Sequence, residues 1–565
     1  MSELHKKTKK CLSINERVLL LMTWTQIYDP MGSLALSALM AAIPVFVIFY
    51  LLAVRRAPGQ IAGSAAMVSA VIVAILVYKM PVATALTATA MGALYGVFPI
   101  FWIVITAIFI YNMTVETGQF EIVKNSIASI TDDRRLQALL VAFAFGAFLE
   151  GAAGFGTPVA ISAGMLVGLG FNPLYAAGLC LIANTAPVAF GGIGIPIIVA
   201  GQVTGIDVMK ISSMVGRQLP FLSVIIPIWL VVLMSGWKSA MEVLPACLVA
   251  GVSFAGLQWF SSNYLGPELP DILSSLAAII GLAVFLKIWK PAKIWRFPNE
   301  PVVAATAAKQ SSDLTFGKIF KAWSPFIVLT VMVILWGIKP IALALDAATI
   351  KVFVPGLDKV VMQVAPIAKQ PTAMAALYKI NWLSAAGTAL FIASIISAAI
   401  LGVGPGRFVA IFAKTFSQLK KPLITIPCVL GLAYIMNYSG MTASMGLFLA
   451  GTGKFFPFFS PLLGWLGVFL TGSDTSANAL FGNLQAVTAQ QVGVSDVLTV
   501  AANSSGGVTG KMISPQSIAV ATAATGLVGK EGDLFNFTVM HSFILCVAVM
   551  IMTYAQAYWL AWMIP

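Results

Sequence analysis

The sequence predicts an all-α polytopic membrane protein with about 12–14 membrane segments in two inverted repeats, whose interrupted or re-entrant helices lie near the membrane midplane. Three observations lead to this fold class. Of the 565 residues, 59% are hydrophobic and only 9% are charged, whereas a soluble domain has roughly 25% charged residues. Apolar stretches recur at about the 20-residue length that a spanning helix needs. Two Gly-rich regions that interrupt them share matching strings.

The apolar stretches form two series, and each stretch is apolar on all faces, as a helix in lipid must be. The first series covers residues 33–54, 62–78, 82–111, 136–149, 219–234, 244–260 and 272–288. The second series covers residues 324–338, 383–403, 423–434, 455–470 and 539–564. We therefore expect a first transmembrane half over residues 22–288 and a second half over residues 324–565.

Basic residues fall between the apolar stretches, where they set orientation relative to the membrane. Residues 289–323 are rich in Lys and Arg and predict a cytoplasmic linker between the halves. Residues 1–21 form a basic extension outside the membrane core. Counting one span per stretch places this extension and residues 339–381 outside the cell. A start at Met22 rather than Met1 would remove the extension, and the sequence leaves both starts open.

Composition also limits the function. The net charge of +13 comes from clusters flanking the spans, so we expect no nucleic-acid partner. The chain has two His residues and five isolated Cys residues, which gives neither a metal site nor a catalytic triad. It contains no GxxxxGK[ST] string for ATP binding. We expect a carrier rather than an enzyme, with the bilayer as its surroundings and with no cofactor.

The two Gly-rich regions cover residues 150–205 and 471–529. The first follows the string FLEG at 148–151, and the second follows FLTG at 469–472. Some thirty residues later come ANTAPVAFGGIGIP at 183–196 and ANSSGGVTGKMISP at 502–515, with Asn and Pro equally spaced in both. Interrupted segments at corresponding places of two halves are typical of a transporter's substrate site. Ordinary helix packing through small residues is the alternative. The span count makes the two regions enter the membrane from opposite sides, as inverted repeats do.

At these strings the chain resembles the bacterial lactate permease family. The resemblance extends over nearly all of residues 22–565 and rests on long strings such as FGAFLEGAAGFGTPVAI at 145–161, NPLYAAGLCLIANTAPVAFGGIGIPI at 172–197, FFSPLLGWLGVFLTGSDTSANALFG at 458–482 and VAANSSGGVTGKMISPQSIAVA at 500–521. The extension and residues 298–316 depart from the pattern. The resemblance implies uptake of L-lactate, D-lactate and glycolate by proton symport, in a multi-pass protein of the bacterial inner membrane.

A monocarboxylate inside a bilayer needs a buried cation, hydrogen-bond donors or helix amino ends to neutralise its charge. Lys511 is the main candidate cation, because an ionisable residue inside such a segment is functional by default. A lysine that snorkels to the interface is the alternative. Arg217 is a second candidate, or else an anchor at a helix end. The candidate donors for the substrate are Asn184, Thr185, Ser473, Asn503, Ser504, Ser505, Thr509, Ser514 and Gln516.

Proton coupling needs a carboxyl whose proton affinity rises on burial. Glu150 and Asp474 directly follow or lie near the matched strings and are the candidate proton carriers, alone or in sequence. A structural carboxylate is the alternative for each. Glu268 and Asp271 lie between spans, where we expect them to end or cap a helix. The acidic and basic residues at 132–135 indicate a solvated loop.

The candidate helix breaks are residues that remove a helix donor or loosen the backbone. They are Gly151, Gly154, Pro158, Pro187, Pro196, Gly510 and Pro515. Unwound carbonyls beside Asn, Thr and Asp also bind sodium in transporters, so a sodium-coupled organic-anion carrier remains an alternative. An anion channel is the alternative from another class.

Overall fold

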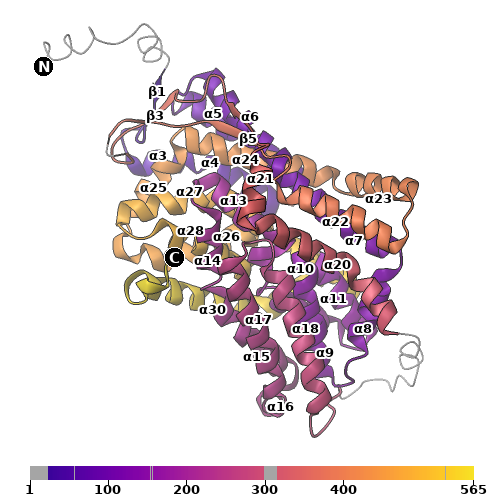
Figure 1. Cartoon of the computed structure of the whole chain (residues 1–565). Helices are drawn as coiled ribbons and strands as arrows, with labels where there is room; N and C mark the ends of the chain where they lie inside the picture. Colours follow the sequence, from indigo (N-terminus) through magenta and orange to yellow (C-terminus); the bar gives the residue numbers. More distant parts are fainter. Residues whose placement is uncertain are drawn as a thin grey trace, which may run out of the picture.

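The computed structural model describes residues 23–55, 57–152, 154, 157–297, 315–368, 370–527 and 530–565. The predicted extension at 1–21 and residues 298–314 of the predicted linker lie outside these residues. The described chain is mainly helical (Figure 1). The helices of the first half are α3 (Leu34–Ala41), α4 (Ile43–Phe49), η2 (Tyr50–Val54), α5 (Gly59–Leu76), α6 (Val82–Tyr95), η3 (Gly96–Phe101), α7 (Trp102–Glu116), α8 (Gln119–Ala128), α9 (Arg134–Ala138), η4 (Leu139–Phe145), α10 (Gly146–Ala152), α11 (Thr157–Gly168), α12 (Pro173–Ala183), η5 (Val188–Phe190), α13 (Gly191–Thr204), α14 (Val208–Val215), α15 (Leu219–Ser235), α16 (Trp237–Glu242), α17 (Leu244–Tyr264) and α18 (Pro270–Ile288).

The second half continues in the same way. Its helices are α20 (Phe316–Gly337), α21 (Lys339–Asp346), α22 (Ala386–Leu401), α23 (Pro405–Gln418), α24 (Lys420–Tyr438), α25 (Met441–Ala450), η6 (Gly453–Phe455), α26 (Phe456–Thr471), α27 (Asp474–Val492), α28 (Asp496–Lys511), α29 (Pro515–Thr525), α30 (Glu531–Tyr558) and η7 (Ala561–Met563). The helix α20 begins inside the segment predicted as linker.

Among the described residues, 10 helical stretches are long and apolar enough to cross a membrane, and up to 12 if two bent pairs each count as one span. The bent pairs are Pro173–Ala183 with Val188–Thr204, at 65°, and Pro405–Gln418 with Lys420–Tyr438, at 53°. The predicted all-α polytopic fold is confirmed, and the number of candidate spans reaches the lower limit of the expected 12–14 only if each bent pair counts as one span. The inverted relationship of the two halves stays a prediction.

Short strands, which the sequence did not lead us to expect, cover one end of the molecule (Figure 1). They are β1 (Trp24–Thr25), β2 (Ile350–Phe353), β3 (Val361–Gln363), β4 (Thr372–Ala373) and β5 (Leu377–Ile380). Strand β1 pairs in parallel with β3, which pairs antiparallel with β4, while β2 and β5 form an antiparallel pair. The start of the described chain and the segment at 350–380 therefore lie on the same side, as the span count requires.

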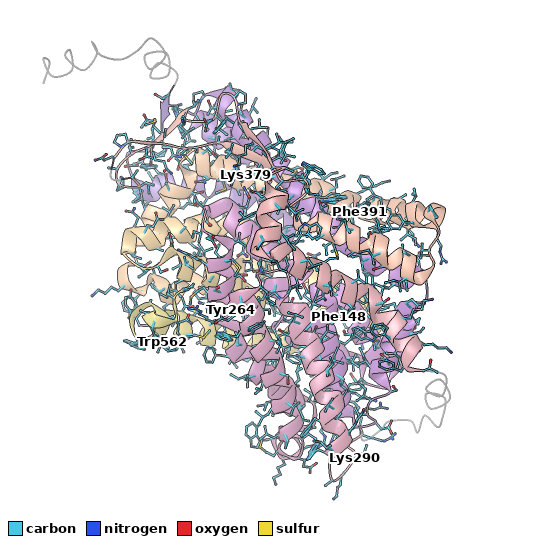
Figure 2. All side chains as sticks on the ribbon, viewed as in Figure 1. Phe148, Tyr264, Lys290, Lys379, Phe391 and Trp562 are labelled. Carbon is cyan, nitrogen blue, oxygen red and sulfur yellow. The ribbon has the colours of Figure 1, made fainter. Side chains whose placement is uncertain are left out.

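Lys379 in this strand region and Lys290 after α18 lie at opposite ends of the molecule in Figure 2. Tyr95 Oη donates to the backbone oxygen of Leu377 over 2.7 Å, and Tyr438 Oη donates to that of Ala375 over 2.8 Å. These bonds attach the strands to α6 and α24. Which of the two ends faces the cytoplasm stays a prediction.

In the segment at 132–135, expected as a solvated loop, Asp132 is exposed but the three residues that follow it are buried. Arg135 is 0% exposed and Asp133 is 1% exposed. Arg135 forms ion pairs of 2.8 Å with both Asp133 and Glu242, and it donates to the backbone oxygen of Lys293 over 3.0 Å. The guanidinium supplies several donors in a fixed fork, so one side chain joins the start of α9 to the segments beside α16 and after α18.

Candidate functional site

The two Gly-rich regions enclose one cavity of about 580 Å³, a volume that includes its opening. Helices α10, α13, α26 and α28 meet in the middle of the molecule (Figure 1). The first region lines the cavity with Glu150, Gly154, Val188, Gly191, Gly192, Ile195 and Pro196. The second region lines it with Gly472, Ser473, Asp474, Thr475, Lys511, Gln516, Ser517 and Val520. Two segments that are far apart in the sequence, at 150–196 and 472–520, thus form one site.

An ion pair crosses this cavity from one region to the other. Lys511 Nζ at the end of α28 lies 2.9 Å from Glu150 Oε1 on α10. The side chains of Lys511 and Glu150 are 10% and 4% exposed. Asn184 Nδ2 donates to the second oxygen, Oε2, of Glu150 over 2.9 Å. Lys511 therefore points inward and does not snorkel to the interface. The buried amine is neutralised by a carboxylate whose two oxygens both have partners.

The first region breaks its helices at two places. Between α10 and α11 the backbone of Gly154 has a φ of 56°. Gly192, Ile193 and Gly194 have φ values of 55°, 60° and 71°, so the right-handed part of α13 begins only after Gly194. A left-handed conformation is unusual for a β-branched residue such as Ile193. Pro196 follows within the first turn of the resumed helix, where its fixed φ suits the helix and its missing N–H costs no bond.

The second region breaks at Gly472, which has a φ of 71°, and between α28 and α29. Ser473 caps α27 by accepting from the backbone N–H of Ser476 over 3.2 Å. Ser514 caps α29 in the same way through the N–H of Ser517. Pro515 opens α29 as Pro196 opens the resumed α13. The amino ends of these helices meet at the cavity, where their N–H groups and partial positive charge favour an anion.

Asp474 stands at the amino end of α27 and lines the cavity. Its Oδ2 accepts from the Ser504 hydroxyl and from Asn478 Nδ2, the latter over 3.4 Å. Its Oδ1 is buried and has no hydrogen-bond partner within the described part of the chain. This oxygen faces Gly507 of α28, where an added Cβ would lie within 2.4 Å of it.

Asn478 joins the two regions behind the cavity. Its Nδ2 donates to the backbone oxygen of Pro196 over 3.1 Å, and its Oδ1 accepts from Asn503 Nδ2 over 2.9 Å. Gln485 Nε2 donates in turn to Asn503 Oδ1 over 3.1 Å. Asn503 and Ser504 therefore support Asn478 and Asp474 and do not line the cavity themselves.

The candidate residues separate into three groups. Those that line the cavity are Glu150, Asp474, Lys511, Ser473 and Gln516. A second group does not line the cavity but forms hydrogen bonds with residues that line it or with Asn478: Asn184, Asn503 and Ser504. Those that are buried outside the lining are Thr185, Ser505, Thr509 and Ser514. The Thr509 hydroxyl donates to the oxygen of Gly506 in its own helix.

Two of the expected helix breaks lie inside helices, where they allow close packing. Gly151 belongs to α10, and a Cβ there would lie 2.7 Å from Asp271 Cβ. Gly510 belongs to α28, and a Cβ there would lie 2.4 Å from the Trp465 oxygen. The other candidates flank the breaks: Gly154, Pro158, Pro187, Pro196 and Pro515.

Arg217 lies outside the cavity lining. Its Nε donates to Asn263 Oδ1 over 2.9 Å, and its Nη1 donates to the backbone oxygen of Met563 over 2.8 Å. These bonds hold the end of the chain against α17. The structure thus favours the alternative, an anchor, over pairing with a substrate carboxylate.

Asp271 corrects another expectation. It lies in the first turn of α18, which begins with no side-chain cap, and it is 1% exposed. Its charge interacts with Glu150 and Lys511. Lys511 was selected because it is an ionisable residue within an apolar segment. Asp271 meets the same criterion once the predicted stretch at 272–288 is extended to Pro270, where α18 begins.

Comparisons with known proteins agree with the resemblance. A family model described as L-lactate permease matches residues 37–560. The chain is 55% identical over 552 residues to the glycolate permease GlcA of Escherichia coli K12, covering 95% of this chain and 99% of the relative. It is 55% identical over 565 residues to the L-lactate permease of Bacillus subtilis 168, covering 96% and 100%. The solved structure of Neisseria gonorrhoeae MtrF, at 13% identity, covers 84% of this chain and 83% of its own with a TM-score of 0.44.

Proposed function

Because the chain belongs to the L-lactate permease family, we propose that it takes up L-lactate, D-lactate and glycolate by proton symport. The chain is a multi-pass transporter of the bacterial inner membrane, and it is not an enzyme. The names of its relatives supply L-lactate and glycolate as substrates, and the family resemblance adds D-lactate. The observation that carries the proposal is the buried Lys511–Glu150 pair in the cavity.

The substrate carboxylate binds Lys511 in place of Glu150. Lys511 is the described cation that lines the cavity, and the amino ends of α27 and α29 add N–H donors beside it. Ser473 and Gln516 line the same space and offer a hydroxyl and an amide to the substrate 2-hydroxyl group. A carboxylate and a neighbouring hydroxyl are the groups that lactate and glycolate share.

A proton makes this exchange of partners possible. While Glu150 is ionised, a second carboxylate near Lys511 would leave one buried negative charge unpaired, which costs several kcal/mol. A proton on Glu150 removes that charge and frees Lys511 for the substrate. Proton and substrate therefore promote each other's binding, and this reciprocity is what symport requires. Asp474, which also lines the cavity, is the second proposed carrier.

Uptake by liposomes containing the purified protein tests the proposal. We expect labelled L-lactate to accumulate inside when the interior is alkaline and no sodium is present. An imposed sodium gradient at equal pH should give no accumulation. Accumulation driven by sodium alone would favour the sodium-coupled alternative. Rapid equilibration without accumulation under either gradient would favour an anion channel.

A further inference from the structure

Asp271 is a buried carboxyl that the proposed exchange of partners at Lys511 does not use. Neither of its oxygens has a hydrogen-bond partner among the residues that the structure describes. It faces Gly151, the residue after Glu150, closely enough that a Cβ on Gly151 would lie 2.7 Å from Asp271 Cβ. It is absent from the cavity lining. Asp271 therefore packs against the turn of α10 that carries Glu150, and it lies outside the cavity lining.

The surroundings of Asp271 contain few charges. Glu150 on α10 and Lys511 on α28 are the charged groups that act on it. Glu268, which precedes α18 by two residues, is the nearest other carboxyl along the chain. The other elements packed on α18 are α17, η4 and α13, and none of them contains a charged residue. Three carboxyls, Glu150, Asp271 and Asp474, thus lie near one amine, that of Lys511, and they cannot all be ionised without leaving a buried negative charge unpaired.

We propose that Asp271 is a further proton-binding residue that passes its proton to Glu150 when substrate enters. This inference rests on the proposed proton symport. Once a substrate fills the cavity, it separates Glu150 from water on that side, and a donor outside the cavity lining is needed. The O–H bond of Asp271 breaks as an O–H bond forms on the Glu150 carboxylate. Asp271 then takes up the incoming proton, so one proton enters with each substrate and both carboxyls end neutral.

Two measurements on the full chain in liposomes test this relay. The first is exchange of labelled for unlabelled L-lactate at equal pH and equal concentration on both sides, which needs no net proton movement. The second is lactate-driven proton entry, followed with a trapped pH-sensitive dye and corrected with protein-free liposomes. The variant is Asp271→Asn, which keeps the shape and stays neutral. The control is Asp207→Asn, because Asp207 caps α14 and Asn caps a helix equally well.

We expect Asp271→Asn to exchange lactate at the parent rate while its proton entry falls by about 100-fold, the size of a lost acid–base step. Asp207→Asn should match the parent in both measurements. Parent-like proton entry in Asp271→Asn overturns the relay. Loss of exchange together with proton entry overturns it as well, because Asp271 would then serve folding or substrate binding. A parent protein that exchanges lactate without moving protons contradicts the proposed symport instead.

Discussion

Lys511 Nζ lies 2.9 Å from Glu150 Oε1, although 361 positions of the chain separate the two residues. Both side chains line the cavity between the two Gly-rich regions. A substrate anion can reach Lys511 only in competition with this carboxylate. Several tests follow from that competition.

Replacing Lys511 should abolish binding. We expect Lys511→Gln to weaken L-lactate binding by about 100-fold or more, because a lost buried charge partner costs about 3 kcal/mol or more. Isothermal titration of the detergent-solubilised protein measures this. The double variant Glu150→Gln/Lys511→Gln removes both charges, so it should regain the thermal stability lost in Lys511→Gln without regaining binding. Parent-like affinity in Lys511→Gln would show that another group binds the carboxylate.

Gly191 tests the position of Glu150 without altering a charge. A Cβ at Gly191 would lie 2.6 Å from Glu150 Oε1, which is closer than such contacts allow. Gly191→Ala should displace Glu150 from Lys511 and lower the initial rate of pH-driven uptake by about tenfold or more, since a shift near 1 Å at a site is that costly. The matched control is Gly256→Ala in α17, where an added Cβ meets nothing within 4 Å. Equal rates in the two variants would contradict this placement of Glu150.

Asp474 is the second proposed proton carrier. Asp474→Asn keeps an oxygen that can accept from Ser504 but cannot exchange a proton. We expect lactate exchange to persist and pH-driven accumulation to fall by about tenfold. This decrease is smaller than the loss in rate of about 100-fold or more that follows removal of an acid–base group. Accumulation ratios measured beside exchange rates in the same liposomes separate the two effects. Unchanged accumulation would leave Glu150 as the only carrier of the pair.

Arg217 should matter for stability alone. Its two hydrogen bonds reach Asn263 and the chain end at Met563, outside the cavity. Arg217→Ala should lower the free energy of unfolding by about 1–3 kcal/mol, the cost of losing bonds to a charged group. The concentration of L-lactate that gives half-maximal uptake should stay at the parent value. A large rise in that concentration would return Arg217 to the list of substrate-binding residues.

The sequence predicted the helices and much of the cavity because both depend on local patterns. Apolar length located the spans, and ionisable residues inside apolar segments identified Glu150, Asp474 and Lys511. The pairing of Glu150 with Lys511 was beyond reach, since it depends on how distant helices pack. Asp271 was missed because the charged string in which it lies resembles a loop. The Arg135–Glu242 ion pair was missed because its two residues lie far apart in the sequence, and the pairing of β1 with β3 was missed for the same reason.

In the proposed symport, a proton on Glu150 takes the place of the ion pair with Lys511 when substrate binds. Glu150→Gln, which mimics a permanently protonated Glu150, tests it most directly. The measurement compares lactate exchange between two loaded compartments with accumulation driven by an alkaline interior, in the same liposomes. We expect exchange to persist while accumulation above equilibrium disappears. Accumulation by Glu150→Gln equal to that of the parent would contradict this role of Glu150.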